Sequence, residues 1–296
     1  MANALIQGLG WFVRRTVKDQ FKLADFYEKN FGMRTVRPPA PPPRNNKMLW
    51  SGDILMFELS SRQGDPDGEA RLPDMIPVLR ARNFDAVVAR LAAAGVTPVE
   101  QTPGTPKYAV FKDPDGFFIA IAEPSTGSPY PSDRMADDLW KYGTVELPGV
   151  AKFGPDVQDM ASVIVKVADP VAMAKFYADV LSLDAFTPAT ATGTVLGMGR
   201  TTSLTLRPGG VKRAIPKDRN VCPDVWILRT KNLKASTDQL KAKGVAIVNE
   251  ITINGGALTY AADPEGHLFG LQQRTPDMYG PDMPVRVEDR EIWKMG

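Results

Sequence analysis

Residues 113–116 read DPDG, and residues 263–266, which lie 150 positions later, read DPEG. Both are turn sequences, because Asp, Pro and Gly supply the side-chain hydrogen bonds and backbone angles of a tight reversal. The same offset relates Phe26-Tyr27 to Phe176-Tyr177, and an offset of 149 relates Gly95 to Gly244. A nearly constant offset over several motifs indicates that one unit has been duplicated.

The ends of the two repeats place the expected domain boundary. Each repeat closes on Trp-Lys-x-Gly, at 140–143 and at 293–296. The sequence therefore predicts two tandem domains, 1–143 with a core over 8–124 and 144–296 with a core over 158–274. Two domains also suit the length of 296 residues, since domains usually hold about 100–200 residues.

Composition excludes several classes of protein. Lys and Arg total 36 against 34 Asp and Glu, which is too balanced for a dedicated nucleic-acid binder. No apolar run approaches the ~20 residues of a membrane span, and the first residues lack a signal-peptide pattern, so we expect a cytoplasmic protein without nucleic-acid or membrane partners. The sequence leaves a homo-oligomer open. A single cysteine, Cys222, and a single histidine, His267, rule out an intrachain disulfide and a two-histidine metal site.

Each half divides into two pieces with the order strand, helix, strands. Asp19 is placed to cap a helix that buries Leu23, Phe26 and Tyr27 on one face, and Gly32 ends it. In the second half Asp169-Pro170 supplies the same kind of helix start. The remaining predicted strands and helices are a strand at 11–17, a strand at 162–167, strands at 78–81 and 226–230, and helices at 84–94 and 233–243.

Four βαβββ modules with a DP(D/E)G turn before the last strand of each half resemble the vicinal oxygen chelate superfamily. The repeated helix signature, LADFY at 23–27 and AKFY at 174–177, supports this resemblance. The superfamily includes glyoxalase I, the bleomycin-resistance proteins, the fosfomycin-resistance enzymes and the extradiol dioxygenases. The resemblance implies an α+β fold of four βαβββ modules, paired within each half into a domain with a U-shaped mixed sheet.

The resemblance also implies a divalent metal in each sheet's cup, held by first-strand His and last-strand Glu residues. The corresponding positions here carry other residues: Phe12, Ser162, Ile76, Val225, Ala120 and Gly270. Glu58 alone matches a glyoxalase-type ligand, and its counterpart in the second half is Thr205. Because a divalent ion normally takes at least three protein ligands, we expect no stoichiometric metal and no other cofactor.

Strand alternation predicts which side chains line the cups, since every second residue faces the same side. The predicted ligand-binding residues are mostly apolar, with cations among them. They are Phe12, Arg14, Met56, Ile76, Arg80 and Phe118 in the first half, and Lys166 and Arg229 in the second. An apolar cup with a few polar groups is typical of a small-molecule site.

The leading functional hypothesis is a metal-independent protein that binds a small, partly aromatic, anionic molecule in one or both cups. The alternatives are a lyase or isomerase with Glu58 as general base, a degenerate enzyme similar to the extradiol dioxygenases, and a scaffold protein whose surface binds a partner. Glu58 is open to a second interpretation, as the partner of Arg14 or Arg80 in an ion pair. His267 is either a half-exposed turn residue or a weaker catalytic candidate.

Overall fold

The computed structural model describes residue 6 and residues 8–16, 18–36, 46–51, 54–61, 74–102, 107–123, 156–198, 202–230, 232–253 and 256–274. All structural statements below concern these residues. The stretch Pro38–Pro43, the boundary at 143/144 and the two closing tails with Trp140 and Trp293 lie outside them. No described helix is long and apolar enough to cross a membrane.

The first half contains the two predicted modules. Their elements are β1 (Gly8–Thr16), α1 (Gln20–Phe31), β2 (Arg34–Val36), β3 (Lys47–Ser51) and β4 (Ile54–Ser61), followed by β5 (Met75–Ala81), α2 (Phe84–Ala93), β6 (Glu100–Thr102), β7 (Tyr108–Lys112) and β8 (Phe118–Ala122). The second half repeats this order. Its elements are β9 (Val157–Val167), α4 (Pro170–Leu181), β10 (Asp184–Ala185), β11 (Thr194–Met198) and β12 (Thr202–Pro208), then the 3-10 turn η1 (Arg219–Val221), β13 (Asp224–Arg229), α5 (Leu233–Ala242), β14 (Ala246–Ile253), β15 (Gly256–Ala262) and β16 (Leu268–Arg274).

The helix boundaries follow from the capping residues that the sequence contains. Asp19 accepts hydrogen bonds from the backbone N–H groups of the first turn of α1, and Gly32 ends the helix in the left-handed conformation (φ 66°). Asp169 caps α4 in the same way, with Pro170 in its first turn. The predicted elements of all four modules are thereby confirmed.

The pairing of the modules differs from the sequence-based expectation. Sheet 1 has the order β14-β15-β16-β13-β1-β4-β3-β2, so it joins the first module to the fourth. Sheet 2 has the order β10-β11-β12-β9-β5-β8-β7-β6, so it joins the second module to the third. The expectation that each sheet is built within one half of the chain is therefore wrong, and each sheet takes four strands from each half.

The strand register shows how the halves are joined. At the centre of sheet 1, β1 runs antiparallel to β13, with Val13 opposite Val225. At the centre of sheet 2, β5 runs antiparallel to β9, with Ile76 opposite Ile164. The first strands of the two modules in one repeat can pair with each other, or each can pair with a first strand of the other repeat. The local sequence patterns are identical in the two cases. The sequence motifs for this reason predicted the modules but not their partners.

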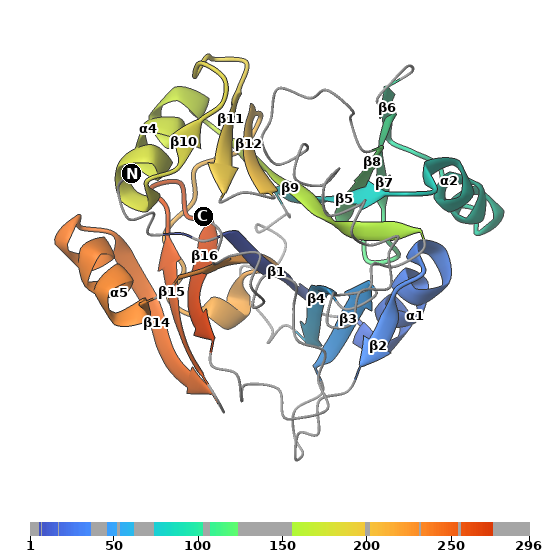
Figure 1. Ribbon diagram of the computed structural model, residues 1–296, viewed down its shortest axis with the longest axis horizontal. Coiled ribbons are helices and arrows are strands. Elements are labelled where there is room, and N and C mark those ends of the chain that lie inside the picture. Colours follow the sequence, from blue (N-terminus) through green and yellow to red (C-terminus); the bar gives the residue numbers. More distant parts are fainter. Residues whose placement is uncertain are drawn as a thin grey trace, which may run out of the picture.

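The two sheets lie back to back with the helices at the sides between them (Figure 1). The main core fills this space and includes residues of both sheets and of the four helices in the described part of the chain, such as Phe12, Tyr27, Val87, Tyr177 and Leu240. Each sheet also carries a separate apolar cluster on its opposite side. We call the side of sheet 1 that bears the cluster around Trp50 face 1, and the side of sheet 2 that bears the cluster around Ile76 face 2.

Candidate functional site

The side chains of β1 that lie on face 1 are not the predicted ones but those of the alternate positions. Trp11 and Val13 belong to the face 1 cluster, whereas Phe12 packs in the main core and contacts Phe57 edge to face. The register explains the error: Val13 pairs with Glu58, and Ile164 in β9 pairs with Thr205. Six positions separate Val13 from the helix-capping Asp19, but five separate Ile164 from Asp169. One extra residue moves every side chain of the strand to the other side.

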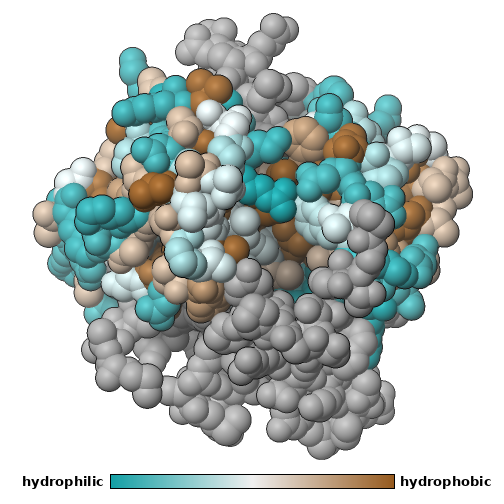
Figure 2. All heavy atoms as spheres, turned by 90° about the horizontal axis from the view of Figure 1, so that it is seen from above, coloured by the Kyte–Doolittle hydropathy of each residue, from teal (hydrophilic) through white to brown (hydrophobic). Residues whose placement is uncertain are grey.

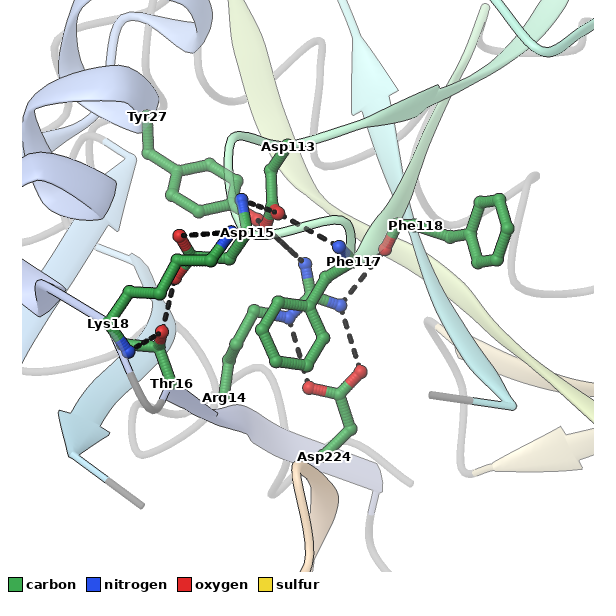
Figure 3. Close-up of polar contacts among 9 residues, drawn as sticks. All are labelled: Arg14, Thr16, Lys18, Tyr27, Asp113, Asp115, Phe117, Phe118 and Asp224. Atoms are coloured by element: carbon green, nitrogen blue, oxygen red, sulfur yellow. Dashed lines mark hydrogen bonds and ion pairs between the residues drawn. The ribbon is translucent and has the colours of Figure 1, made fainter. Parts of the chain in front are cut away.

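As a consequence, Arg14 lies in the interior behind the sheet rather than in a cup (Figure 3). Its guanidinium binds Asp224 through Nε (3.0 Å to Oδ1) and Nη2 (2.9 Å to Oδ2). It also donates to the hydroxyl of Tyr27 at 2.7 Å, to Asp113 at 3.2 Å and to the backbone oxygen of Phe118 at 2.9 Å. Because Asp113 and Phe118 belong to the second module, which forms part of sheet 2, Arg14 holds the two sheets together.

This buried network shifts the pKa of its carboxyl groups. Burial raises the pKa of Asp224 to about 6, although Arg14 works in the opposite direction. The pKa of Asp113 is likewise raised by burial and partly restored by Arg14 and the hydrogen bond from Tyr27. Both acids depend on Arg14 for their charge, so Arg14 is a structural residue and not the ligand-binding residue predicted from the sequence.

The two DP(D/E)G turns share one further contact that the sequence did not reveal. Asp113 accepts backbone hydrogen bonds within its turn, and its other oxygen accepts the hydroxyl of Tyr27 at 2.8 Å. In the second half Asp263 accepts the hydroxyl of Tyr177 at 2.7 Å in the same arrangement. The cation differs, because His267 Nδ1 lies 2.8 Å from Asp263 where the first half uses Arg14.

His267 is consequently buried, with 5% of its surface exposed, and the expectation of a half-exposed turn histidine is wrong. Burial disfavours the imidazolium, but the hydrogen bond and charge of Asp263, with smaller contributions from Asp74 and Glu265, raise its pKa above 6.5. A raised pKa means that protonated His267 stabilises the fold. This contribution is complete below pH 6.5 and is lost as the pH rises through the pKa of the folded state.

We expect the imidazole of His267 to titrate above pH 6.5 in the folded protein. Because the chain has one histidine, a single imidazole C–H signal in an NMR titration measures this pKa directly. Asp263→Asn should move the midpoint below about 6.5, since burial then acts without the main opposing charge. A wild-type midpoint at or below that value would show that the Asp263 contact does not outweigh burial.

Four of the predicted ligand-binding residues lie on sheet 2. Ile76 belongs to the face 2 cluster, Phe118 packs against it, and Lys166 lies over the ring of Phe118. Arg80 is almost fully buried, and its Nη1 donates to both carboxylate oxygens of Asp159, at 2.9 Å to each. None of them shares a face with Glu58, so the single cup predicted for the first half does not exist.

Face 1 has an apolar floor with two indole rings. Trp11, Trp50, Val225, Ile227 and their neighbours form one cluster on this side of sheet 1. Met56, predicted to line the cup, packs in the main core instead. Cys222 is buried in the floor cluster, in agreement with a packing role.

Polar residues from both halves of the chain meet above this floor. Arg219 donates to the hydroxyl of Tyr260 at 3.0 Å, and its guanidinium lies 5.0 Å from the centre of that ring. Burial raises the pKa of Tyr260, the charge of Glu58 raises it further, and Arg219 and Arg15 oppose this. Glu58 accepts a hydrogen bond from Asn46 Nδ2 at 2.7 Å.

Glu58 and Tyr260 come from different parts of sheet 1. Glu58 lies on β4 and Tyr260 on β15, with β1, β13 and β16 between them in the sheet, yet the charge of Glu58 acts on the phenol and raises its pKa. The expected ion pair of Glu58 with Arg14 or Arg80 is not formed, because both arginines bind other carboxylates. Arg229 lies in β13 with Val225 and Ile227, and its Nη2 donates to the backbone oxygen of Leu9.

The residues at the metal positions of face 1 do not fit a metal. Ile227 pairs with Trp11 on one side and with Gly270 on the other, so apolar side chains occupy the row beside Glu58. A Cβ atom on Gly270 would lie 2.5 Å from the δ-methyl of Ile227, so an apolar side chain occupies the place that a ligand at this position would need. Among the described residues, no three His, Cys, Asp or Glu side chains are grouped as a metal ion would require.

Two residues of this site, Arg15 and Arg219, escaped prediction from the sequence. Arg15 was overlooked because the extra residue after β1 reversed the assignment of its neighbours. Arg219 precedes β13 in a 3-10 turn, capped by Asp218, that no repeat motif marks. Tyr260, which precedes the second DP(D/E)G turn, lies on face 1 as part of the floor cluster.

Comparison with known proteins agrees with this architecture. The model of the Glyoxalase/Bleomycin resistance protein/Dioxygenase superfamily matches residues 8–121. A proposed dioxygenase from Bacillus subtilis has a TM-score of 0.63 at 13% identity, covering 96% of this chain and 91% of its own. Glyoxalase I from Zea mays has a TM-score of 0.59 at 16% identity, covering 90% of this chain and 92% of its own. No curated protein matches the sequence.

At identities this low the solved structures establish the fold alone, while the family model identifies the first half by its sequence. The model of the Glyoxalase/Bleomycin resistance protein/Dioxygenase superfamily matches residues 8–121, and the chain as a whole shares its fold with these two solved structures, as the resemblance to the vicinal oxygen chelate proteins predicted.

Proposed function

We propose that the protein binds a small, partly aromatic, anionic molecule on face 1. The observation that carries this proposal is the combination of an apolar floor containing Trp11 and Trp50 with the guanidinium groups of Arg15 and Arg219 near the phenol of Tyr260 above it. Indole rings suit a flat apolar group, and a guanidinium suits a carboxylate or phenolate.

The charges favour an anion over a neutral ligand. The described charged groups around Tyr260 on face 1 are the guanidinium groups of Arg15 and Arg219 and the carboxylate of Glu58. Of these, Arg219 makes its described side-chain contact with Tyr260, a phenol whose raised pKa keeps it neutral at ordinary pH, so no acid cancels its charge in that contact. A ligand carboxylate in this position would gain a charge-assisted hydrogen bond.

Replacing Arg219 by glutamine tests this proposal. We expect the variant to bind aromatic carboxylates such as benzoate and naphthoate about five- to tenfold more weakly, the effect of losing about 1–1.5 kcal/mol. Binding is measured by calorimetry and by tryptophan fluorescence, since Trp11 and Trp50 lie on this face. Arg90→Gln is the matched control, because Arg90 lies on α2, outside face 1, where it pairs with Asp156 at 2.8 Å. Equal affinities in the two variants, or no binding by the wild type, would contradict the proposal.

A second candidate is proton transfer by Glu58. It is favoured by the position of the Glu58 carboxylate, whose charge raises the pKa of Tyr260 while the charges of Arg219 and Arg15 lower it. Glu58→Gln separates binding from catalysis. A binding protein should hold an anion as well or better after this change, since a like charge is removed. An enzyme that uses Glu58 as general base should lose about 10²–10⁴-fold in turnover while it still binds.

A further inference from the structure

We propose that face 2 is a second binding site, specific for an anionic aryl molecule. In the free protein Arg207 spans the entrance of this site, and on binding it contacts the anionic group of the ligand. This proposal is independent of the function of face 1, because no residue of face 1 takes part. It rests on three features of sheet 2: an apolar floor, two aromatic rings with cations on them, and a contact that spans the mouth of the curved sheet.

The floor of face 2 consists of small and branched apolar side chains, namely Ile76, Val78, Val110, Ala120 and Ile164. Phe118 and Tyr108 pack against its edge as half-buried rings. Arg14 holds the backbone oxygen of Phe118 from behind, while the ring points away from that network (Figure 3). Seen from above in Figure 2, hydrophilic and hydrophobic residues lie side by side in the middle of the molecule.

Two lysines lie against the Phe118 ring. The ammonium of Lys166 is 5.0 Å from the ring centre, and that of Lys112 is 5.2 Å from it. Neither lysine has a carboxylate partner among the described residues, whereas Lys107, near the start of β7, contacts both Asp85 and Glu123. An exposed lysine without a binding role usually extends into water. Lys112 and Lys166 instead lie against the same ring, so an anion beside the Phe118 ring would contact both ammonium groups.

Arg207 spans the mouth of the sheet. It lies on β12, next to Lys166 in the register, and its guanidinium is 5.7 Å from the ring centre of Tyr108 on β7. The strands β9, β5 and β8 separate β12 from β7 in the sheet, so the two arms of sheet 2 curl toward each other. Arg207 also pairs with Glu100 on the edge strand β6 at 3.4 Å, with 38% and 50% of the two side chains exposed.

The long and exposed Arg207–Glu100 contact is weak, because solvent screens it. A ligand whose ring packs against the half-buried rings of Tyr108 and Phe118 at the edge of the floor, and whose anionic group replaces the Glu100 carboxylate, would exchange this contact for a better one. Arg207, Lys166 and Lys112 would then surround the anionic group, and Tyr108 and Phe118 would flank the ring. Glu100 in this arrangement competes with the ligand, so its removal should strengthen binding.

The test uses a matched pair of probes, 1-anilinonaphthalene-8-sulfonate and N-phenyl-1-naphthylamine, which share their rings but differ in the sulfonate. Calorimetry with the full-length protein measures both affinities. Lys166→Gln/Arg207→Gln should weaken binding of the sulfonate about tenfold, leave the neutral probe within about twofold, and bring the ratio of the two affinities closer to one. Glu100→Gln should strengthen sulfonate binding about two- to fivefold.

The control double variant is Lys175→Gln/Lys234→Gln, which removes the same two charges from the exposed faces of α4 and α5. It should change sulfonate affinity less than twofold. Equal losses of sulfonate affinity in the two double variants would mean that overall charge explains the effect, and would overturn the proposal. A loss of affinity confined to Arg15→Gln/Arg219→Gln would also overturn it, because the probe would then bind on face 1. If the double variant unfolds, Lys166→Gln alone should still give about a threefold loss, and no loss there overturns the proposal.

Discussion

Cut between residues 143 and 144, the chain should yield two fragments that do not fold separately but combine into a 1:1 complex. Each sheet is assembled from both repeats, so fragment 1–143 alone would leave β1 without β13 and β5 without β9. These are the central strands of the two sheets, and their free edges would expose apolar ladders such as those around Val13 and Ile76. Each fragment should therefore aggregate or remain largely unstructured in isolation.

The measurement is circular dichroism and sedimentation of each fragment, alone and mixed in equal amounts. The mixture should recover the spectrum and cooperative thermal unfolding of the intact chain. Ile227→Pro in the second fragment is the control, because proline in the middle of β13 removes a ladder hydrogen bond and blocks pairing with β1. Two stable monomeric fragments would instead mean that β1 pairs with β5 within one repeat, as the sequence alone suggests.

Prediction from the sequence succeeded best where the determinant is local. The capping residues Asp19 and Asp169, the glycines that end the helices and turns, and the 150-residue offset between DPDG and DPEG all rest on a few neighbouring residues at a time. The capping residues and glycines predicted boundaries that the structure confirms. The fold class followed because four such modules suit few other architectures.

The pairing of the modules and the orientation of β1 could not be predicted in the same way. Both repeats present equivalent central strands, so no local pattern distinguishes pairing within a repeat from pairing between repeats. In β1 both alternating sets, Trp11-Val13-Arg15 and Phe12-Arg14-Thr16, combine aromatic or apolar residues with an arginine. The periodicity of two was correct, but its phase depended on one extra residue before α1.

These two errors had a common effect on the candidate site. Glu58 lies beside the apolar floor of face 1, but its predicted companions belong to the wrong strand phase and the wrong module. The two arginines that oppose the effect of Glu58 on the pKa of Tyr260 are Arg15 and Arg219. Arg15 follows the predicted Arg14 on β1, and Arg219 comes from the other half of the chain. Contacts at such a sequence separation leave no periodic signal in one sequence.

Arg14→Met should destabilise the protein by about 3–5 kcal/mol, because it breaks a fully buried network of charges. Methionine fills similar space but leaves Asp224 and Asp113 buried without their cation and Tyr27 without one of its partners. Arg90→Met is the matched control, because the Arg90–Asp156 pair is partly exposed. It should cost about 1 kcal/mol or less.

The pH dependence of this loss identifies its cause. The pKa of Asp224 is already about 6 with Arg14 present, because burial outweighs the arginine, and without Arg14 it should rise further. A carboxyl whose pKa is raised on folding favours the folded state at low pH, and this contribution is lost as the pH rises through the folded pKa. The deficit of Arg14→Met relative to wild type, measured by urea unfolding, should therefore be larger at about pH 8 than at about pH 5. A deficit independent of pH would mean that lost packing against Phe12 and Phe117, and not the unpaired carboxylates, explains the loss.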